Sequence, residues 1–201
     1  MKITIIDYGM GNIKSIIGAL KYLGVKDITV SSNLSEIASA DKLILPGVGS
    51  FSAAMGSLNE SGLAEYVRNQ VKTKRPLIGI CVGMQLLANT GYEKGKHNGL
   101  GWIEGDVKKL PKERIKLPHM GWNEVIPKKT LESNIFIEEN NYYFVHSYYF
   151  ACEDINNILG HTNYGIDFAS IVSKENIYGV QFHPEKSSNQ GLNLIKSFIQ
   201  I

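Results

Sequence analysis

The sequence predicts an α/β fold with a central, mostly parallel sheet flanked by helices and an additional antiparallel section in the second half. In the first half, short apolar runs alternate with helical periodicity, and three of these runs end at glycine-containing loops. In the second half, short β-like runs follow one another closely. A length of 201 residues suits one well-formed core, so we expect a single domain over residues 1–201.

The first half is predicted to consist of strand and helix units. Residues 2–7 are a candidate buried strand, and isoleucine and leucine then recur at helical spacing from Ile13 to Leu23. A break near Ser61 and Gly62 divides a later helical region into two pieces. The other elements expected here are strands over residues 28–31, 42–45 and 77–80, helical pieces within residues 51–72, and a helix directly after Cys81.

The second half is predicted to extend the same sheet with antiparallel strands. We expect strands near residues 101–110, 123–126, 142–150, 169–172 and 178–182, and a closing amphipathic helix over residues 192–201. In folds of this kind, ligands bind at the carboxyl ends of the parallel strands. The loops after residues 45 and 80 are therefore candidate site positions.

Composition argues against several classes of protein. Basic and acidic residues nearly balance, 21 against 19, so no strong field points to nucleic acid, and no apolar run approaches the roughly 18 residues that span a bilayer. The first apolar run is too short for a signal peptide. With only Cys81 and Cys152, a disulfide framework is excluded and a cytoplasmic location is expected. The basic stretch 108–116 is either a solvated surface or a surface for an acidic or phosphorylated partner.

The most informative feature is Cys81, at the centre of Gly79-Ile80-Cys81-Val82-Gly83. The apolar run before it and the helical stretch after it indicate a sharp turn from strand to helix. Glycines tolerate crowded backbone angles, and free N–H groups at a helix start stabilise a thiolate. We therefore expect Cys81 to be an exposed nucleophile. The alternative is a cysteine that only fills the core.

A cysteine nucleophile needs a general base, and the base needs an orienting group. His183 and Glu185 are separated by one rigid proline, so both side chains can project in the same direction. The carboxylate can then hold the imidazole tautomer. His146 is a competing candidate base, but it has no carboxylate nearby in sequence.

Acyl transfer also requires donors for a developing oxyanion. The amide of Val82, next to the nucleophile, can supply one donor, and the loop Pro46-Gly47-Val48-Gly49 can supply another if one of its peptides points inward. The alternative for this loop is a plain turn at a strand exit. The first loop, Gly9-Met10-Gly11-Asn12, lacks the third glycine of a dinucleotide fingerprint, so we expect no such cofactor. Because the chain has only two cysteines, we also expect no metal site built on thiolates.

Together these motifs resemble the triad of the class I glutamine amidotransferases. The resemblance is carried by residues 79–85 and 179–185. Pro46-Gly47-Val48-Gly49, Leu117-Pro118-His119-Met120-Gly121-Trp122-Asn123 and Pro184-Glu185-Lys186-Ser187 narrow it to the glutaminase subunits of imidazole glycerol phosphate synthases, in histidine biosynthesis. It covers essentially the whole chain and implies the class I glutamine amidotransferase fold.

The resemblance also implies a role for each residue of the site. Cys81 would attack the glutamine side-chain amide, His183 would carry the proton to the departing ammonia, and Glu185 would orient His183. Val48 and Gly49 match the segment whose peptide turns to complete the oxyanion hole. Four further positions match contacts to glutamine: Gln85, Glu93 and, through their backbone, Ser147 and Tyr148.

A partner protein is expected as well. Free ammonia is protonated and non-nucleophilic in neutral water, and the predicted elements use all 201 residues, so the acceptor chemistry must lie on another polypeptide. The resemblance implies a heterodimer with a cyclase subunit, a (β/α)8 barrel that makes imidazole glycerol phosphate and an aminoimidazole carboxamide ribonucleotide. Trp122 would anchor the interface, or else pack in the core. Asn12, Tyr143 and Lys186 are further interface candidates.

Three other functions are alternatives to a glutaminase of this synthase. A serine-hydrolase-like enzyme with cysteine as nucleophile would place its acid before the histidine, whereas Glu185 follows His183. A catalytically silent scaffolding subunit would be expected to lack a triad member, and all three are present. An amidotransferase subunit of a different synthase is the main alternative, and residues 118–123 argue against it.

Overall fold

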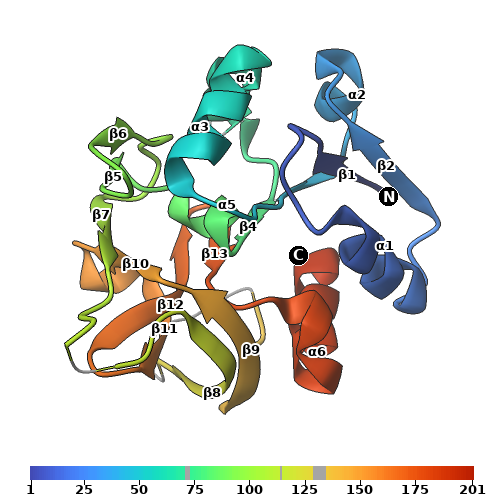
Figure 1. Ribbon diagram of the computed structural model, residues 1–201. Coiled ribbons are helices and arrows are strands. Elements are labelled where there is room, and N and C mark those ends of the chain that lie inside the picture. The colour runs from blue at the N-terminus through green and yellow to red at the C-terminus, as the bar shows by residue number, and fades with distance from the viewer. Residues whose placement is uncertain (71–72, 114, 129–134) are drawn as a thin grey trace.

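The structure is a computed structural model that describes residues 1–70, 73–113, 115–128 and 135–201. Its first half alternates strands with helices, as predicted (Figure 1). The last two positions of the predicted helical region and position 114 of the basic stretch lie outside the described residues. In chain order the elements of this half are β1 (Lys2–Ile6), α1 (Ile13–Tyr22), β2 (Asp27–Ser31), α2 (Leu34–Ala38), β3 (Lys42–Leu45), α3 (Phe51–Glu60), α4 (Leu63–Gln70), β4 (Leu77–Ile80) and α5 (Val82–Gln85).

The second half is mainly β structure, and one longer helix ends it. Two short 3-10 turns also occur: η2 lies between β10 and β11, and η3 lies between β13 and α6. In chain order the elements are β5 (Thr90–Gly91), β6 (His97–Asn98), β7 (Gly105–Lys109), β8 (His119–Pro127), β9 (Asn140–His146), β10 (Tyr148–Cys152), η2 (Ile155–Asn157), β11 (Ile158–Asn163), β12 (Asp167–Lys174), β13 (Ile177–Val180), η3 (Pro184–Lys186) and α6 (Ser188–Gln200).

Five strands form the parallel part of the sheet, in the order β2, β1, β3, β4 and β13. In Figure 1, α2, α3 and α4 lie on one side of these strands, and α1 and α6 lie on the other. Because helices cover both faces, β3, β4 and β13 are buried along their whole length, which explains why their sequences are almost entirely apolar. The carboxyl ends of β3 and β4 therefore meet at one edge, where the predicted site loops lie.

The remaining strands add an antiparallel section, as predicted. β12 pairs antiparallel with β13, β10 with β12, and β7 with β10. β11 connects β12 to β8, and β8 pairs antiparallel with β9. At the outer edge, β5 lies parallel to β7 and antiparallel to β6. The predicted α/β fold with a mostly parallel centre is confirmed.

Several predicted element bounds are wrong. The single strand expected over residues 142–150 is two strands, because β9 pairs with β8 whereas β10 pairs with β7 and β12. The chain changes pairing partners at Ser147, next to the site described below. The last helix begins at Ser188 rather than at 192, and Gly191, which resembles a helix breaker in sequence, is buried where the chain passes close to Pro184. Six elements among the described residues were not predicted: α2, β5, β6, β11 and the 3-10 turns η2 and η3.

Among the described residues, none of the helices combines the length and the apolar character that crossing a membrane requires.

A substitution of Gly83 tests how closely the turn after β4 packs against the end of β3. A Cβ atom there would overlap the carbonyl oxygen of Leu45, well inside the 3.0 Å that real Cβ atoms keep. We expect Gly83→Ala to lower the free energy of unfolding by about 1–3 kcal/mol, measured by urea denaturation. The control is Gly18→Ala in α1, where a Cβ meets nothing within 4 Å, and which should stabilise by about 1 kcal/mol. Equal effects of the two changes would contradict this packing.

Candidate active site

Cys81 lies at the turn between β4 and α5, as predicted, with φ of 56° and ψ of −112°. A positive φ is strained for a residue with a side chain, at a cost of about 1–3 kcal/mol, and such strain gathers at functional sites. The turn is possible because Gly79 and Gly83 approach each other closely: a Cβ on Gly79 would lie 2.5 Å from the Gly83 carbonyl oxygen. The fold therefore holds the sulfur at the start of α5, beside backbone N–H groups that have no carbonyl partner within the helix.

The expectation that Cys81 is exposed is wrong, since the residue is only 4% exposed. Its sulfur lies 3.9 Å from the Val145 carbonyl oxygen and 3.9 Å from Nε2 of Gln181, which donates to it. β9 and the segment after β13 therefore cover the turn on the side of the Cys81 sulfur. The sulfur remains accessible through a cavity rather than from the open surface.

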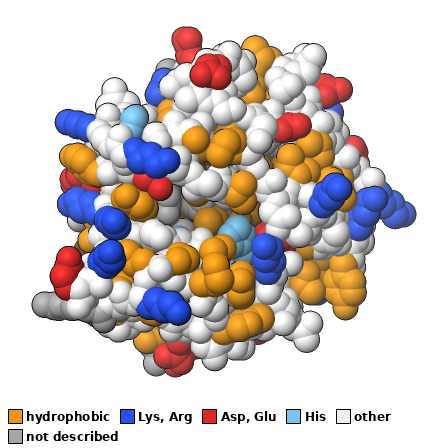
Figure 2. Space-filling view, viewed as in Figure 1, with side chains coloured by type: hydrophobic (Ala, Val, Ile, Leu, Met, Phe, Trp, Pro, Cys, Tyr) orange, Lys and Arg blue, Asp and Glu red, His pale blue; other side chains and the backbone are white. Residues whose placement is uncertain are grey.

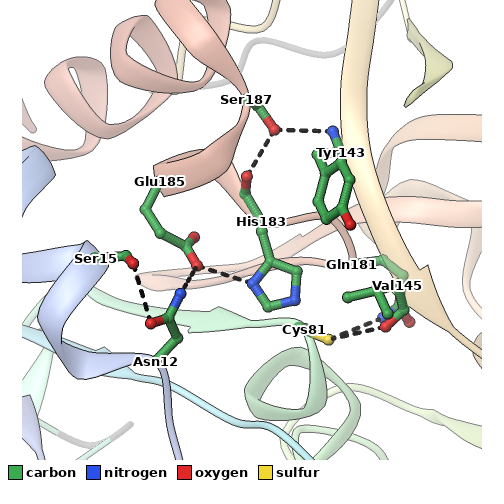
Figure 3. A network of polar contacts seen from close by, with 9 residues as sticks. All are labelled: Asn12, Ser15, Cys81, Tyr143, Val145, Gln181, His183, Glu185 and Ser187. Carbon is green, nitrogen blue, oxygen red and sulfur yellow. Dashed lines mark hydrogen bonds and ion pairs between the residues drawn. The ribbon is translucent and has the colours of Figure 1, made fainter. Parts of the chain in front are cut away.

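His183 faces this sulfur from the segment that follows β13 (Figure 3). Its Nδ1 atom lies 2.9 Å from Oε1 of Glu185, and the imidazole is 3% exposed. The backbone is fixed on both sides: the His183 N–H donates to the Tyr143 carbonyl at 2.9 Å, and the Ser187 hydroxyl donates to the His183 carbonyl at 2.6 Å. Because Nδ1 is paired with the carboxylate, Nε2 is the ring nitrogen left to face the sulfur.

Opposing effects set the charge of His183. Burial disfavours the imidazolium, but hydrogen bonding to Cys81 and Glu185, together with their negative charges, outweighs it and raises the pKa of His183 to about 10. A protonated His183 beside the sulfur stabilises a thiolate and also holds a proton for a leaving group. The pair is therefore arranged for nucleophilic attack followed by proton transfer.

The predicted site residues surround one cavity of about 320 Å³. The sulfur and the imidazole both face it, while Glu185 lies behind His183, away from the cavity. The volume suits a small ligand. The lining residues are Val48, Gly49, Cys81, Val82, Gln85, Glu93, Pro118, Val145, His146, Ser147, Tyr148 and His183.

The candidate oxyanion loop is held at its base. The Tyr8 hydroxyl donates to the Pro46 carbonyl at 2.6 Å, and Gly49 has a φ of +85°, which favours glycine. Val48 is 38% exposed at the cavity rim. Val82, on the other side, is the first residue of α5, so its N–H has no carbonyl within the helix. The loop and the start of α5 thus border the same cavity beside the sulfur, and N–H groups of both are candidate donors to a ligand there.

The candidate glutamine contacts are also ordered. Gln85 uses Nε2 to donate to the Tyr148 carbonyl at 2.9 Å and to Oε1 of Gln181 at 3.0 Å, which leaves its own Oε1 for a ligand. Glu93 accepts a hydrogen bond from the Phe51 N–H at 2.7 Å, so its carboxylate sits at the start of α3. Nothing in the sequence around Glu93 indicates this second role, as an acceptor at the start of α3.

The four predicted interface residues fall into two groups. Trp122 and Tyr143 form a cross-strand pair with ring centroids 6.1 Å apart, and the Lys186 ammonium lies 5.9 Å from the Tyr143 ring. Trp122 is 52% exposed, so it is not a core residue. Asn12, in contrast, donates to Oε1 of Glu185 at 3.3 Å and therefore belongs to the hydrogen-bond network of His183 (Figure 3).

Sequence reasoning missed Gln181 and the surroundings of His146. Gln181 is fully buried against the sulfur, and its position two residues before His183 places both on one side of the extended segment, a signal that was available. His146 lines the cavity but uses both ring nitrogens elsewhere, Nδ1 with the Tyr148 carbonyl and Nε2 with His119. The structure therefore does not favour His146 as the base.

This geometry defines a cysteine nucleophile with a histidine and a carboxylate, at the carboxyl edge of an α/β sheet. The family model described as "Glutamine amidotransferase class-I" matches residues 4–201, so the chain belongs to this family. A crystal structure of a glutamine amidotransferase has the same fold, with a TM-score of 0.77 and 19% identity over 98% of this chain and 97% of the other. The predicted class I glutamine amidotransferase fold is confirmed.

Within this family, the chain is similar over its full length to subunits of one synthase. An imidazole glycerol phosphate synthase subunit HisH 2 from Methanococcus maripaludis is 48% identical over 202 residues, or 98% of each chain. An imidazole glycerol phosphate synthase subunit HisH from Bdellovibrio bacteriovorus is 45% identical over 207 residues, covering 99% of this chain and 100% of the relative. The resemblance inferred from the motifs is confirmed.

Proposed function

We propose that this protein hydrolyses glutamine to glutamate and ammonia through Cys81, His183 and Glu185, and passes the ammonia to a cyclase subunit in histidine biosynthesis. The observation that carries the proposal is the joint placement of the Cys81 sulfur and the Glu185-bound His183 on one cavity, at the start of α5. The full-length likeness to HisH subunits supports the choice of synthase. The whole chain, residues 1–201, would act as one domain in the cytoplasm.

The chemistry follows from this arrangement. The thiolate of Cys81 attacks the amide carbon of glutamine, and negative charge develops on the amide oxygen, where N–H groups of Val82 and of the Val48–Gly49 segment stabilise it. His183 donates its proton to the amide nitrogen, the C–N bond breaks, and ammonia leaves a γ-glutamyl thioester. Water, deprotonated by His183, then hydrolyses the thioester to glutamate and restores the thiolate.

The cavity also suits the rest of the substrate. Glutamine carries an α-ammonium group, for which Glu93 supplies the negative charge, and the Gln85 carbonyl can accept from a substrate N–H. Backbone groups of Ser147 and Tyr148 complete the wall. We expect no cofactor and no metal ion in this reaction, since every step uses side chains of this chain.

Ammonia must reach its acceptor without meeting bulk water, which would protonate it. The relatives are named as subunits of a synthase, which supports a partner, and we propose that it is a (β/α)8-barrel cyclase that forms a heterodimer with this chain. Figure 2 shows apolar side chains near the centre of one face, with lysine and arginine side chains around them. On β8, Met120 and Trp122 are 62% and 52% exposed and share one face of the strand. An exposed apolar surface of this kind is typical of an interface.

Glutamate release tests the proposed function. We expect the complex of this chain with the cyclase subunit and its nucleotide ligand to release glutamate from glutamine, and the chain alone to be nearly silent. A complex that releases no glutamate would contradict the glutaminase function. High turnover by the chain alone would instead contradict the dependence on a partner.

Trp122 should dominate binding of the partner. We expect Trp122→Ala to raise the dissociation constant of the complex by at least about 30-fold, because large exposed aromatic residues contribute much of the binding free energy of interfaces. Isothermal titration calorimetry measures the constant. Tyr22→Ala is the matched control, since Tyr22 is 77% exposed at the far end of α1 from Asn12 and should leave binding unchanged. Unchanged affinity of the Trp122 variant would move the interface away from β8.

A further inference from the structure

A line of hydrogen bonds runs from β8 into the wall of the cavity, through two histidines that the proposed mechanism does not use. The Asn123 amide lies 3.2 Å from Nε2 of His119, and Nδ1 of His119 lies 2.9 Å from Nε2 of His146. Nδ1 of His146 lies 2.7 Å from the Tyr148 carbonyl oxygen. Both imidazoles are buried, at 3% and 6% exposed.

The line continues to the sulfur. The Tyr148 carbonyl also accepts from the Gln85 amide, which donates a second time to Gln181, and Gln181 in turn donates to Cys81. The Tyr148 carbonyl is therefore held by a histidine on one side and by a cavity-lining glutamine on the other. Its position determines where the Gln85 amide points.

Only one arrangement of protons satisfies every partner. A carbonyl oxygen can only accept, so His146 must carry its hydrogen on Nδ1, and its Nε2 must then accept from an N–H on Nδ1 of His119. That leaves Nε2 of His119 to accept from Asn123, whose amide orientation is fixed because Oδ1 accepts from the Glu124 N–H at 2.9 Å. A proton added to either ring would place two N–H groups against each other. The line is complete only when both histidines are neutral.

The surroundings favour the neutral forms. His119 is stacked between Tyr164 and Phe144, with ring centroids 3.9 and 4.8 Å away. Burial lowers the pKa of His119 to about 4. Burial also lowers the pKa of His146 to about 3, with smaller contributions from the nearby His119 and His183 and an opposing one from the Tyr148 carbonyl. Burial therefore favours the uncharged form of both rings.

We propose that His119 and His146 are positioning residues for glutamine, which as a neutral pair fix the Tyr148 carbonyl and, through it, the Gln85 amide in the wall of the cavity. This inference rests on the proposed function, because its substrate is glutamine. Neither histidine touches the reacting atoms in this scheme, so their loss acts on substrate affinity more than on the chemical step.

Two substitutions of His119 separate this role from packing. His119→Leu introduces an apolar side chain of similar size and removes the donor to His146. His146 cannot compensate by changing tautomer, because its Nδ1 faces a carbonyl. His119→Asn keeps an amide N–H near the position of Nδ1. We expect His119→Leu to raise the KM for glutamine about tenfold with kcat within about twofold of wild type, and His119→Asn to restore most of the affinity.

The measurement is glutamate release by the complex with the cyclase subunit and its nucleotide ligand. An unchanged KM in His119→Leu would overturn the inference. The same change in kcat and in KM for His119→Leu and His119→Asn would overturn it as well. Failure of the proposed function has a different signature, since the wild-type complex would then release no glutamate at any glutamine concentration.

A second measurement needs no variant. Nitrogen-15 spectra of the histidine rings in the full-length wild-type chain should show both residues as neutral Nδ1–H tautomers between about pH 5 and 8. An Nε2–H tautomer or a charged ring at either position would contradict the inference, even if the His119 variants failed to fold.

Discussion

Cys81→Ser is expected to abolish glutamine-dependent synthesis by the complex while leaving ammonium-dependent synthesis largely intact. The serine hydroxyl is a far weaker nucleophile than a thiolate beside an imidazolium, so the glutamine reaction should fall by more than roughly a thousandfold. Added ammonium bypasses this chain and enters the acceptor reaction on the partner. The measurement is the rate of product formation by the complex with either nitrogen source.

The size of the side chain is nearly preserved in this variant, so the binding surface should be intact. Cys152→Ala is the matched control: the Cys152 thiol donates to the Asp154 carbonyl at 3.4 Å, away from the cavity residues, and burial raises its pKa to about 11. That variant should retain glutamine-dependent activity and lose only some stability. Loss of both glutamine- and ammonium-dependent synthesis in Cys81→Ser would show that Cys81 has a structural rather than a catalytic role.

His183→Ala should cause a comparable loss of glutamine-dependent synthesis. Without the imidazole, the thiolate loses its counter-charge and the leaving ammonia loses its proton donor. Glu185→Gln should be milder, by about 100-fold relative to His183→Ala, because an amide oxygen can still accept from Nδ1 and from Asn12. Steady-state glutamate release by the complexes measures both.

Comparing His183→Ala with Glu185→Gln tests which residue is the base and what the carboxylate contributes. A fully active His183→Ala variant would assign the base to another residue, and His146, on the same cavity, would be the first to test. A Glu185→Gln variant as inactive as His183→Ala would mean that the carboxylate charge, and not only its hydrogen bond, is required.

The residues that the sequence revealed are those whose signal is local. The turn at Cys81 is visible because two glycines and a change from strand to helix pattern lie within a few residues. His183 and Glu185 are recognisable because they are separated by one proline. The parallel strands were predicted well because burial on both faces gives continuous apolar runs, as in β3 and β4.

What the sequence could not reveal depends on pairing between distant segments. His119 and His146 meet because they are register partners in the β8–β9 ladder, and nothing near either residue indicates that register. The division of the predicted strand at Ser147 follows from a change of strand partners, which is also long-range. The burial of Cys81 arises from Val145 and Gln181, both far away in sequence.

Trapping of the acyl intermediate tests the central claim most directly. The complex, mixed with glutamine and quenched in acid, should yield a peptide containing Cys81 that carries a γ-glutamyl group, detected by mass spectrometry. The account predicts this thioester on Cys81 and its absence from Cys152. Steady release of glutamate with no acyl group on Cys81, or with the group on another residue, would contradict it.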